Sequence, residues 1–227
     1  MTSTHLVTGA GSGIGAGLAE RLLERGDEVV ALARSDSRAH DLRADLPGAT
    51  VLVADLADAA GLGSLSGQLP DALDSVVHAA GVVDLGPVAD LSAATWIEQL
   101  TVNLVAPAVL TRLALPALRA TGGTVVFVNS GAGLTARPTW SAYAASKHGL
   151  RALADSLRAE ELQHGVRVTS VFPGRTATPM QAKVHEQEGK DYDAEQWIQP
   201  ATVVDLILRV LDLSADATIP EVVISPV

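Results

Sequence analysis

The chain has 227 residues, of which 48% are hydrophobic, 19% charged and 3% aromatic, and its formal net charge at pH 7 is −10. This length predicts one domain with enough chain to bury a core. The acidic balance argues against nucleic acid or an anionic membrane surface as a partner, because both attract basic surfaces. The absence of cysteine excludes disulfides and thiolate zinc sites, and the histidines lack the HExxH or comparable spacing, so no metal is expected.

The apolar segments are short. The longest uninterrupted runs, such as Val125–Val128, are far below the roughly 18 residues of a membrane span. The N-terminus lacks a basic segment followed by an apolar one, so no signal peptide is expected. These features predict a soluble, cytoplasmic protein.

Short apolar runs alternate along the chain with longer helical patterns. Because the runs are apolar throughout, they are typical of strands buried on both faces of a parallel sheet. Strands are predicted at His5–Thr8, Glu28–Ala33, Thr50–Ala54, Ser75–Ala79, Thr124–Asn129, Arg167–Phe172 and Glu221–Ile224. Helices are predicted at Ile14–Arg25, Ser37–Leu46, Gly61–Leu69, Ala94–Arg119, Ser141–His164 and Ala201–Leu213. This order predicts a single-domain α/β fold over residues 1–227, a Rossmann-type, doubly wound parallel sheet of about seven strands with helices on both faces.

One segment, Gly174–Gln199, departs from this pattern. It is polar and rich in acidic residues. Long loops in compact domains are usually functional or mobile, which predicts a substrate-side loop. A solvated acidic excursion is the alternative.

A glycine-rich turn, Thr8–Gly15, joins the first strand to the first helix. Glycines permit a tight turn and a close approach of the backbone to a ligand. The helix N-terminus then offers unpaired N–H groups and partial positive charge to a pyrophosphate. The turn therefore predicts a bound dinucleotide, held by Gly9, Gly11, Ser12, Gly13, Ile14 and Gly15.

The end of the second strand bears on the choice of cofactor. Dinucleotide folds usually carry an acidic residue there for the ribose 2′-hydroxyl, but this chain has Ala33 followed by Arg34. A guanidinium can bind a 2′-phosphate by paired hydrogen bonds, which favours NADP(H) over NAD(H). Arg34 as an ordinary surface arginine is the alternative, with Asp36 then reaching the ribose.

Tyr143 and Lys147 stand four residues apart, on one face of a predicted helix. The chain contains only two tyrosines and three lysines, so chance gives such a pair rarely. A nearby ammonium favours the phenolate and lowers the phenol's pKa, so Tyr143 could exchange protons near neutral pH. An ordinary pair on a helix surface is the alternative.

Ser130 and Asn103 extend this pattern. Ser130 ends a strand at the carboxyl edge of the sheet, where ligands bind, and its hydroxyl could bind a substrate oxygen beside Tyr143. Asn103 precedes Pro107 by four residues, and because proline lacks an N–H, the Asn103 carbonyl is free to hold a water linked to Lys147. A simple helix kink is the alternative.

Together these motifs resemble the short-chain dehydrogenase/reductase family, in its classical branch, over essentially the whole chain. Thr8–Gly15 matches the family's TGxxxGxG motif, and Tyr143 with Lys147 matches YxxxK. Ser130 and Asn103 complete the family's Asn-Ser-Tyr-Lys tetrad. The resemblance implies that Lys147 also holds the nicotinamide ribose.

The resemblance implies further cofactor contacts. The acidic pair after the third strand resembles the family's adenine contact, and a later segment resembles the PGxxxT motif at the nicotinamide end. The family's NNAG is His78-Ala79-Ala80-Gly81 here. Segments Gln199–Val203 and Ile219–Pro226 resemble the NADP-dependent subset that includes 3-hydroxy acid dehydrogenases. The cofactor contacts implied in this way are Asp55, Leu56, Ala80, Gly81, Pro173, Gly174, Thr176 and Thr178.

These features predict an NADP(H)-dependent oxidoreductase that interconverts a carbonyl and an alcohol, acts on a small molecule and forms a homodimer or homotetramer. Two alternatives are a non-catalytic nucleotide-dependent regulatory protein and an isomerase or lyase with a retained cofactor. Arg137 and Arg175 could pair with a substrate carboxylate, or be structural cations. An apolar rim of the substrate pocket is expected from Val82, Val83, Trp140, Met180, Tyr192 and Trp197.

Overall fold

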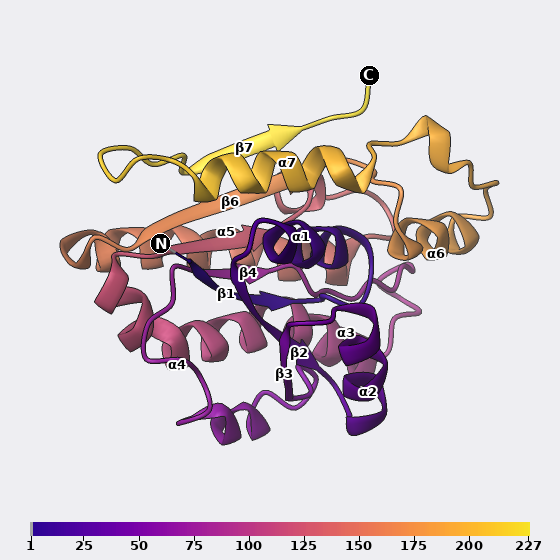
Figure 1. Cartoon of the computed structure of the whole chain (residues 1–227). Coiled ribbons are helices and arrows are strands. Elements are labelled where there is room, and N and C mark those ends of the chain that lie inside the picture. Colours follow the sequence, from indigo (N-terminus) through magenta and orange to yellow (C-terminus); the bar gives the residue numbers. More distant parts are fainter. Residues whose placement is uncertain (1) are drawn as a thin grey trace.

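Seven apolar segments pair into one all-parallel sheet in the computed structural model, which describes residues 2–227 (Figure 1). Their order in the sheet is β3-β2-β1-β4-β5-β6-β7. The predicted α/β class and parallel sheet are confirmed, and each predicted strand ends within one residue of the observed one. The strands are β1 (Thr4–Thr8), β2 (Glu28–Ala33), β3 (Thr50–Val53), β4 (Ser75–His78), β5 (Thr124–Val128), β6 (Arg167–Pro173) and β7 (Glu221–Ile224).

Helices cover both faces of this sheet. One face packs against α1 (Gly13–Glu24), α2 (Asp36–Asp45) and α7 (Pro200–Leu211). The other packs against α4 (Ala106–Thr121), α5 (Ser141–Glu161) and the 3₁₀ turn η1 (Gly61–Leu65). The remaining elements are α3 (Ala93–Leu100), the π-helical turn η2 (Thr101–Val105), α6 (Pro179–Gln187) and the 3₁₀ turns η3 (Gly131–Gly133), η4 (Leu162–His164) and η5 (Ala194–Gln196).

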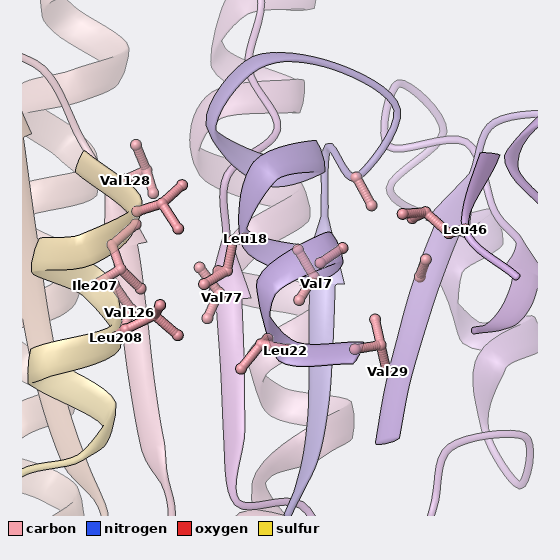
Figure 2. Close-up of a cluster of buried hydrophobic side chains, with 14 of the residues drawn as sticks. Val7, Leu18, Leu22, Val29, Leu46, Val77, Val126, Val128, Ile207 and Leu208 are labelled. Atoms are coloured by element: carbon pink, nitrogen blue, oxygen red, sulfur yellow. The ribbon is translucent and has the colours of Figure 1, made fainter. Parts of the chain in front are cut away.

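Successive residues of each central strand enter opposite cores. Leu6 of β1 belongs to the α4–α5 core, whereas Val7 belongs to the α1–α7 core. Figure 2 shows the latter, with Leu18 and Leu22 of α1 directed toward the strands. Both leucines are fully buried, and they lie one helical turn apart on the same side of α1. Burial on both faces explains why the strand sequences are apolar without alternation.

Three predicted elements differ from the structure. The long helix Ala94–Arg119 is divided by η2, and the helix at Gly61–Leu69 is only a short 3₁₀ turn. The segment Gly174–Gln199, expected to be a loop, contains α6. This helix starts where Thr178 accepts a hydrogen bond from the Gln181 N–H and Pro179 occupies the first turn.

One helical stretch, Ala93–Thr121, is long and apolar enough to cross a membrane by length and composition alone. It is not an uninterrupted apolar run, because it contains Asn103, Thr111 and Arg112. Its α4 part places Leu110 and Leu118 fully inside the core against the sheet. Core helices of soluble proteins pass the same test of length and hydropathy.

The strand order reverses direction between β1 and β4. The chain runs from β1 outward to β3, then returns to β4 on the other side of β1. In open α/β sheets, the loops that leave the carboxyl ends of strands at such a point diverge and leave a crevice. The turn Thr8–Gly15 and the segment after His78 both begin at this crevice.

His78, at the end of β4, is buried, and its ring has both a stacking partner and a hydrogen-bond partner. Its ring stacks on Phe127, with centroids 5.0 Å apart and planes 8° from parallel. Its Nε2 atom lies 2.8 Å from Thr111 Oγ1. Burial lowers the pKa of His78 to about 3, so the folded protein holds this ring neutral.

The stability of the protein should therefore decrease as the pH falls below about 6.5, the pKa of an unfolded histidine. Below that pH the unfolded chain binds a proton at His78, whereas the folded chain binds it only near pH 3. When the pH is lowered from 7 to 5.5, the free energy of unfolding measured by urea titration should fall in both proteins. The fall should be about 1 kcal/mol smaller in H78N than in the wild type. H40N, at an exposed position on α2, is the matched control. Equal pH dependence of H78N and the wild type would contradict this account.

Candidate active site

The turn after β1 brings three backbone segments into close contact. Gly9 has a φ of +72°, and a side-chain carbon there would lie 2.8 Å from the Ala80 nitrogen. A side-chain carbon on Gly15 would overlap the carbonyl oxygen of Gly9. The Ser12 side chain makes no capping hydrogen bond to the first turn of α1, so the N–H groups of that turn are available to an anion.

A single cavity of about 990 Å³ extends from this turn along the carboxyl edge of the sheet. Gly15 and Asn103 are absent from its lining. Gly15 packs against Gly9, and the Asn103 side chain is buried in hydrogen bonds. The other predicted site residues all line the cavity: Gly9, Gly11, Ser12, Gly13, Ile14, Arg34, Asp55, Leu56, Ala80, Gly81, Ser130, Tyr143, Lys147, Pro173, Gly174, Thr176 and Thr178.

Two arginines lie at the glycine-turn end of the cavity. Arg34 is exposed and follows the buried end of β2. Arg38, four residues later on α2, also lines the cavity, and its Nη2 atom would lie 3.5 Å from a side-chain carbon at Gly11. Asp36 is absent from the lining. A backbone cradle with no room for Cβ atoms, free N–H groups and adjacent cations fit a dinucleotide cofactor. Arg38 was missed in the sequence, because only the packing of the first turn of α2 beside the glycine turn brings it to the cavity.

Tyr143 and Lys147 lie buried on α5, and Ser130 follows β5 at the same end of the cavity. Lys147 Nζ lies 5.8 Å from the centre of the Tyr143 ring and donates a hydrogen bond to the Val128 carbonyl at 3.0 Å. Burial raises the pKa of Tyr143 to about 12, although the Ser130 hydroxyl opposes this shift. Burial also lowers the pKa of Lys147 to about 8. The expected lowering of the Tyr143 pKa is not found, because desolvation of the phenol is the dominant effect here.

Asn103 acts through its side chain in this structure. Its amide oxygen accepts from the Val82 N–H at 2.8 Å, and its amide nitrogen donates to the Val82 carbonyl at 2.9 Å and to Ser146 Oγ at 3.0 Å. The expected kink before Pro107 is a π-helical turn, Thr101–Val105. The Asn103 side chain therefore fixes the loop after β4 to helix α5. The water held by its carbonyl stays a prediction.

Asn129 is a site residue that the sequence reasoning missed. Its amide oxygen accepts from the Ser130 N–H at 2.8 Å, and its amide nitrogen donates to the Lys147 carbonyl at 3.0 Å. A side-chain carbon on Gly133 would collide with Asn129 and lie 2.9 Å from that carbonyl. Asn129 therefore joins the end of β5 to α5 at the position of Lys147. Its only sequence signal is that it is a polar residue ending a buried strand.

The end of the cavity that lies away from the glycine turn, where Tyr143 stands, is apolar. Val83, Tyr143 and Val184 form a buried cluster with Trp140 and Met180 packed against it. The Trp140 ring meets the Tyr143 ring edge-on, with centroids 5.8 Å apart at 67°. The expected rim residues Val82, Val83, Trp140 and Met180 line the cavity, whereas Tyr192 and Trp197 do not. These two rings pack on His185 instead, each with its centroid 5.2 Å away.

Helix α6 is attached across this apolar end by a polar clasp. Lys183 Nζ lies 2.7 Å from Asp84 Oδ1, and Gln187 Nε2 donates to the same oxygen at 2.8 Å. The Leu85 N–H donates to Gln187 Oε1 at 3.1 Å. The clasp connects α6 to the loop after β4, so two segments about a hundred residues apart in sequence enclose the apolar end.

Known proteins share this sequence and fold. The family described as short chain dehydrogenase matches residues 3–189. An uncharacterized oxidoreductase of Staphylococcus epidermidis is 28% identical over 227 residues, covering 98% of this chain and 96% of its own. A solved structure from Escherichia coli CFT073, described as a short chain dehydrogenase and complexed with NADPH, is 28% identical with a TM-score of 0.87, covering 97% of this chain and 95% of that one. A 4-hydroxyisoleucine dehydrogenase mutant complexed with NADH and succinate is 28% identical with a TM-score of 0.85, covering 99% of this chain and 97% of that one.

Replacing Asn129 should impair turnover more than cofactor binding. N129A removes both hydrogen bonds that join the Ser130 N–H and the Lys147 carbonyl, so these groups shift relative to each other. We expect kcat to fall by about 10-fold or more, with the Kd of the nicotinamide cofactor changed by less than about 3-fold. T169V, which removes a hydrogen bond to Ile219 far along β6, is the matched control. Equal kcat losses in both variants would indicate a general loss of stability and contradict the positioning role.

Proposed function

This chain belongs to the short-chain dehydrogenase family, whose fold and oxidoreductase character it shares, and we propose that it is an NADP(H)-dependent enzyme that interconverts a carbonyl and an alcohol. One observation carries the proposal. Ser130, Tyr143 and Lys147 line one end of the same cavity whose other end is the glycine cradle of α1. A buried phenol and a backbone cradle suited to a phosphate thus line one cavity of about 990 Å³, which has room for a cofactor and a small molecule.

Tyr143 gives the proton to the carbonyl oxygen in reduction and takes it from the alcohol in oxidation. Ser130 donates a hydrogen bond to the same oxygen and orients it. A charged Lys147 favours the phenolate and holds the nicotinamide ribose, and its pKa of about 8 leaves it mostly charged at neutral pH. The bound nicotinamide supplies or accepts the hydride. Trp140 packs edge-on against Tyr143, and the ion pair of Lys183 with Asp84 holds α6 over the apolar end, so both reduce the access of water to the reacting atoms.

The preference for NADP(H) rests on the cations at the end of β2. Ala33 occupies the usual place of the acidic residue, and Arg34 and Arg38 line the cavity beside the glycine turn. The Arg34 guanidinium favours a 2′-phosphate over a free hydroxyl. Arg38 adds its Nη2 group, because only its Nη1 atom is bonded to Asp41, at 3.1 Å. One solved relative is complexed with NADPH and another with NADH, so similarity to these structures does not decide the cofactor. In this chain, Arg34 with Arg38 supports NADP(H).

We further propose that the protein works in the cytoplasm on a small-molecule substrate, as a homodimer or homotetramer. Ile97 and Val105, on the stretch formed by α3 and η2, are 64% and 42% exposed. These two exposed apolar side chains lie about two helical turns apart, and exposed apolar surface of this kind is suited to contact with a second copy. Gel filtration of the purified chain distinguishes these assemblies.

The Tyr143 role predicts a selective loss of chemistry. NADPH consumption is first measured over aldehydes, ketones and oxo acids to find a substrate. Y143F should then lower kcat by about 10²- to 10⁴-fold, while NADPH fluorescence titration gives an unchanged Kd. Y192F is the matched control, because the chain has only one other tyrosine and it lies outside the cavity. Retention of a large fraction of kcat in Y143F would remove the tyrosine from the mechanism. NADPH binding without turnover of any carbonyl would favour a regulatory role.

The cofactor proposal predicts an effect on one nucleotide only. R34A removes a charged hydrogen-bond donor from the 2′-phosphate, so the NADPH Kd should rise by about 10- to 100-fold. NADH lacks that phosphate, and its Kd should change by less than about 3-fold. Equal losses for both cofactors in the same titration would place Arg34 outside the phosphate site.

A further inference from the structure

Arg137 and Arg175 are the two cations of the cavity that the proposed function leaves unexplained. The Arg175 guanidinium is already neutralised. Its Nη2 atom lies 2.7 Å and 2.8 Å from the two Glu188 carboxylate oxygens, and the group stacks on Trp197 with its carbon 5.4 Å from the ring centre. Arg175 is therefore a structural cation that supports the segment around α6.

Arg137 has no such partner. Arg137 is exposed to solvent, and among residues 2–227 it takes part in no ion pair and in no side-chain hydrogen bond, whereas Arg175 is paired with Glu188. Glu98, the carboxylate that lines the cavity from α3, is not paired with it. The side chain nevertheless lines the cavity together with Ser130 and Tyr143. A full positive charge without a counter-ion thus stands in the same cavity as the proposed proton donor.

The backbone around Arg137 is held in a strained turn. The Trp140 N–H donates to the Arg137 carbonyl at 3.2 Å, which closes a turn with Pro138 and Thr139 as its central residues. Thr139 has a φ of +69°, and among residues 2–227 it is the one non-glycine residue with a positive φ. A β-branched residue adopts this region only under strain. The turn persists because the Gly86 N–H donates to the Thr139 carbonyl at 2.8 Å.

This turn carries two residues of the pocket, Arg137 and Trp140. It places Trp140 edge-on against the Tyr143 ring and Arg137 three residues earlier at the mouth of the cavity. Pro138 sets its own φ and limits the motion of the turn. Strain retained at such a position is typical of sites that orient functional groups. The Arg137 side chain is exposed and without a partner, so its guanidinium is free to offer a planar pair of donors that matches a carboxylate in the cavity.

We propose that the substrate carries a carboxylate, and that Arg137 binds it while Tyr143 and Ser130 bind the carbonyl or alcohol oxygen. This inference rests on the proposed function and names its substrate class: an oxo acid and the corresponding hydroxy acid. In reduction, the carbonyl carbon gains a hydride from the nicotinamide and its oxygen gains the Tyr143 proton. The carboxylate is unchanged and serves to anchor the molecule. The apolar wall of Val83, Met180 and Val184 accommodates the carbon chain between these two ends.

Straight-chain 2-, 3-, 4- and 5-oxo acids, each compared with its methyl ester, test the proposal with NADPH as the reductant. For at least one chain length, wild-type kcat/KM should be about 10-fold or more higher for the acid than for the ester. In R137Q, kcat/KM should fall by about 10- to 100-fold for that acid, mainly through a higher KM, and by less than about 2-fold for the ester. R112Q is the matched control, because Arg112 is exposed on α4 away from the cavity.

A second measurement is independent of turnover. Butanoate, pentanoate and hexanoate are titrated calorimetrically into protein saturated with NADP⁺, beside the corresponding amides. The wild type should bind a carboxylate at least about 10-fold more tightly than its amide, and R137Q should bind the two equally.

The outcomes separate the two proposals. Esters reduced as well as acids, or R137Q and R112Q with the same kinetics on acids, would overturn the role of Arg137 and leave the carbonyl reduction intact. Calorimetric binding of carboxylates through Arg137, without NADPH oxidation by any compound, would support the anion site and overturn the proposed reaction. Absence of both carboxylate binding and turnover would overturn both.

Discussion

The site depends on one constraint, the close packing of helix α5 against the end of β5. The Asn129 side chain links the two segments, because it accepts a hydrogen bond from the Ser130 N–H and donates one to the Lys147 carbonyl. Gly133 allows this close approach, since a side-chain carbon there would lie 2.9 Å from the same carbonyl. The loop after β4 is fixed to the same helix through a second buried amide. Ser130, Tyr143 and Lys147 therefore hold their places relative to the strand ends without help from the exposed segments.

Much of the fold could be predicted because each strand is buried on both faces and so is apolar throughout. The same reasoning failed at α6, whose sequence Pro179–Gln187 has few apolar residues and packs by only one side. Its capping threonine and first-turn proline were nevertheless visible as helix-start signals. The sequence did not indicate that the helix forms a π-helical turn around Asn103. Pro107 accounts for a missing backbone hydrogen bond, but the missing bond can produce either a kink or a wider turn.

The candidate site could be predicted where its residues form local motifs, as in Thr8–Gly15 and in Tyr143 with Lys147. Contacts between distant segments left no such signal. The bonds of Asn129 depend on how α5 packs. The tilted contact of the Trp197 ring with His185 takes an expected rim residue away from the cavity. Burial likewise reversed the expected direction of the Tyr143 pKa shift. Spacing on a helix reports which groups are neighbours, whereas desolvation depends on everything packed around them.

The central claim is that the cavity transfers a hydride between NADP(H) and a carbon atom whose oxygen exchanges a proton with Tyr143. NADPH carrying deuterium at both positions of the nicotinamide C4 atom, incubated with the wild type and its best carbonyl substrate, tests this directly by mass spectrometry and chiral chromatography of the product. The account predicts one deuterium on the carbon that bears the new hydroxyl, with a single stereochemistry. A product without deuterium, or with deuterium equally on both faces, would contradict it.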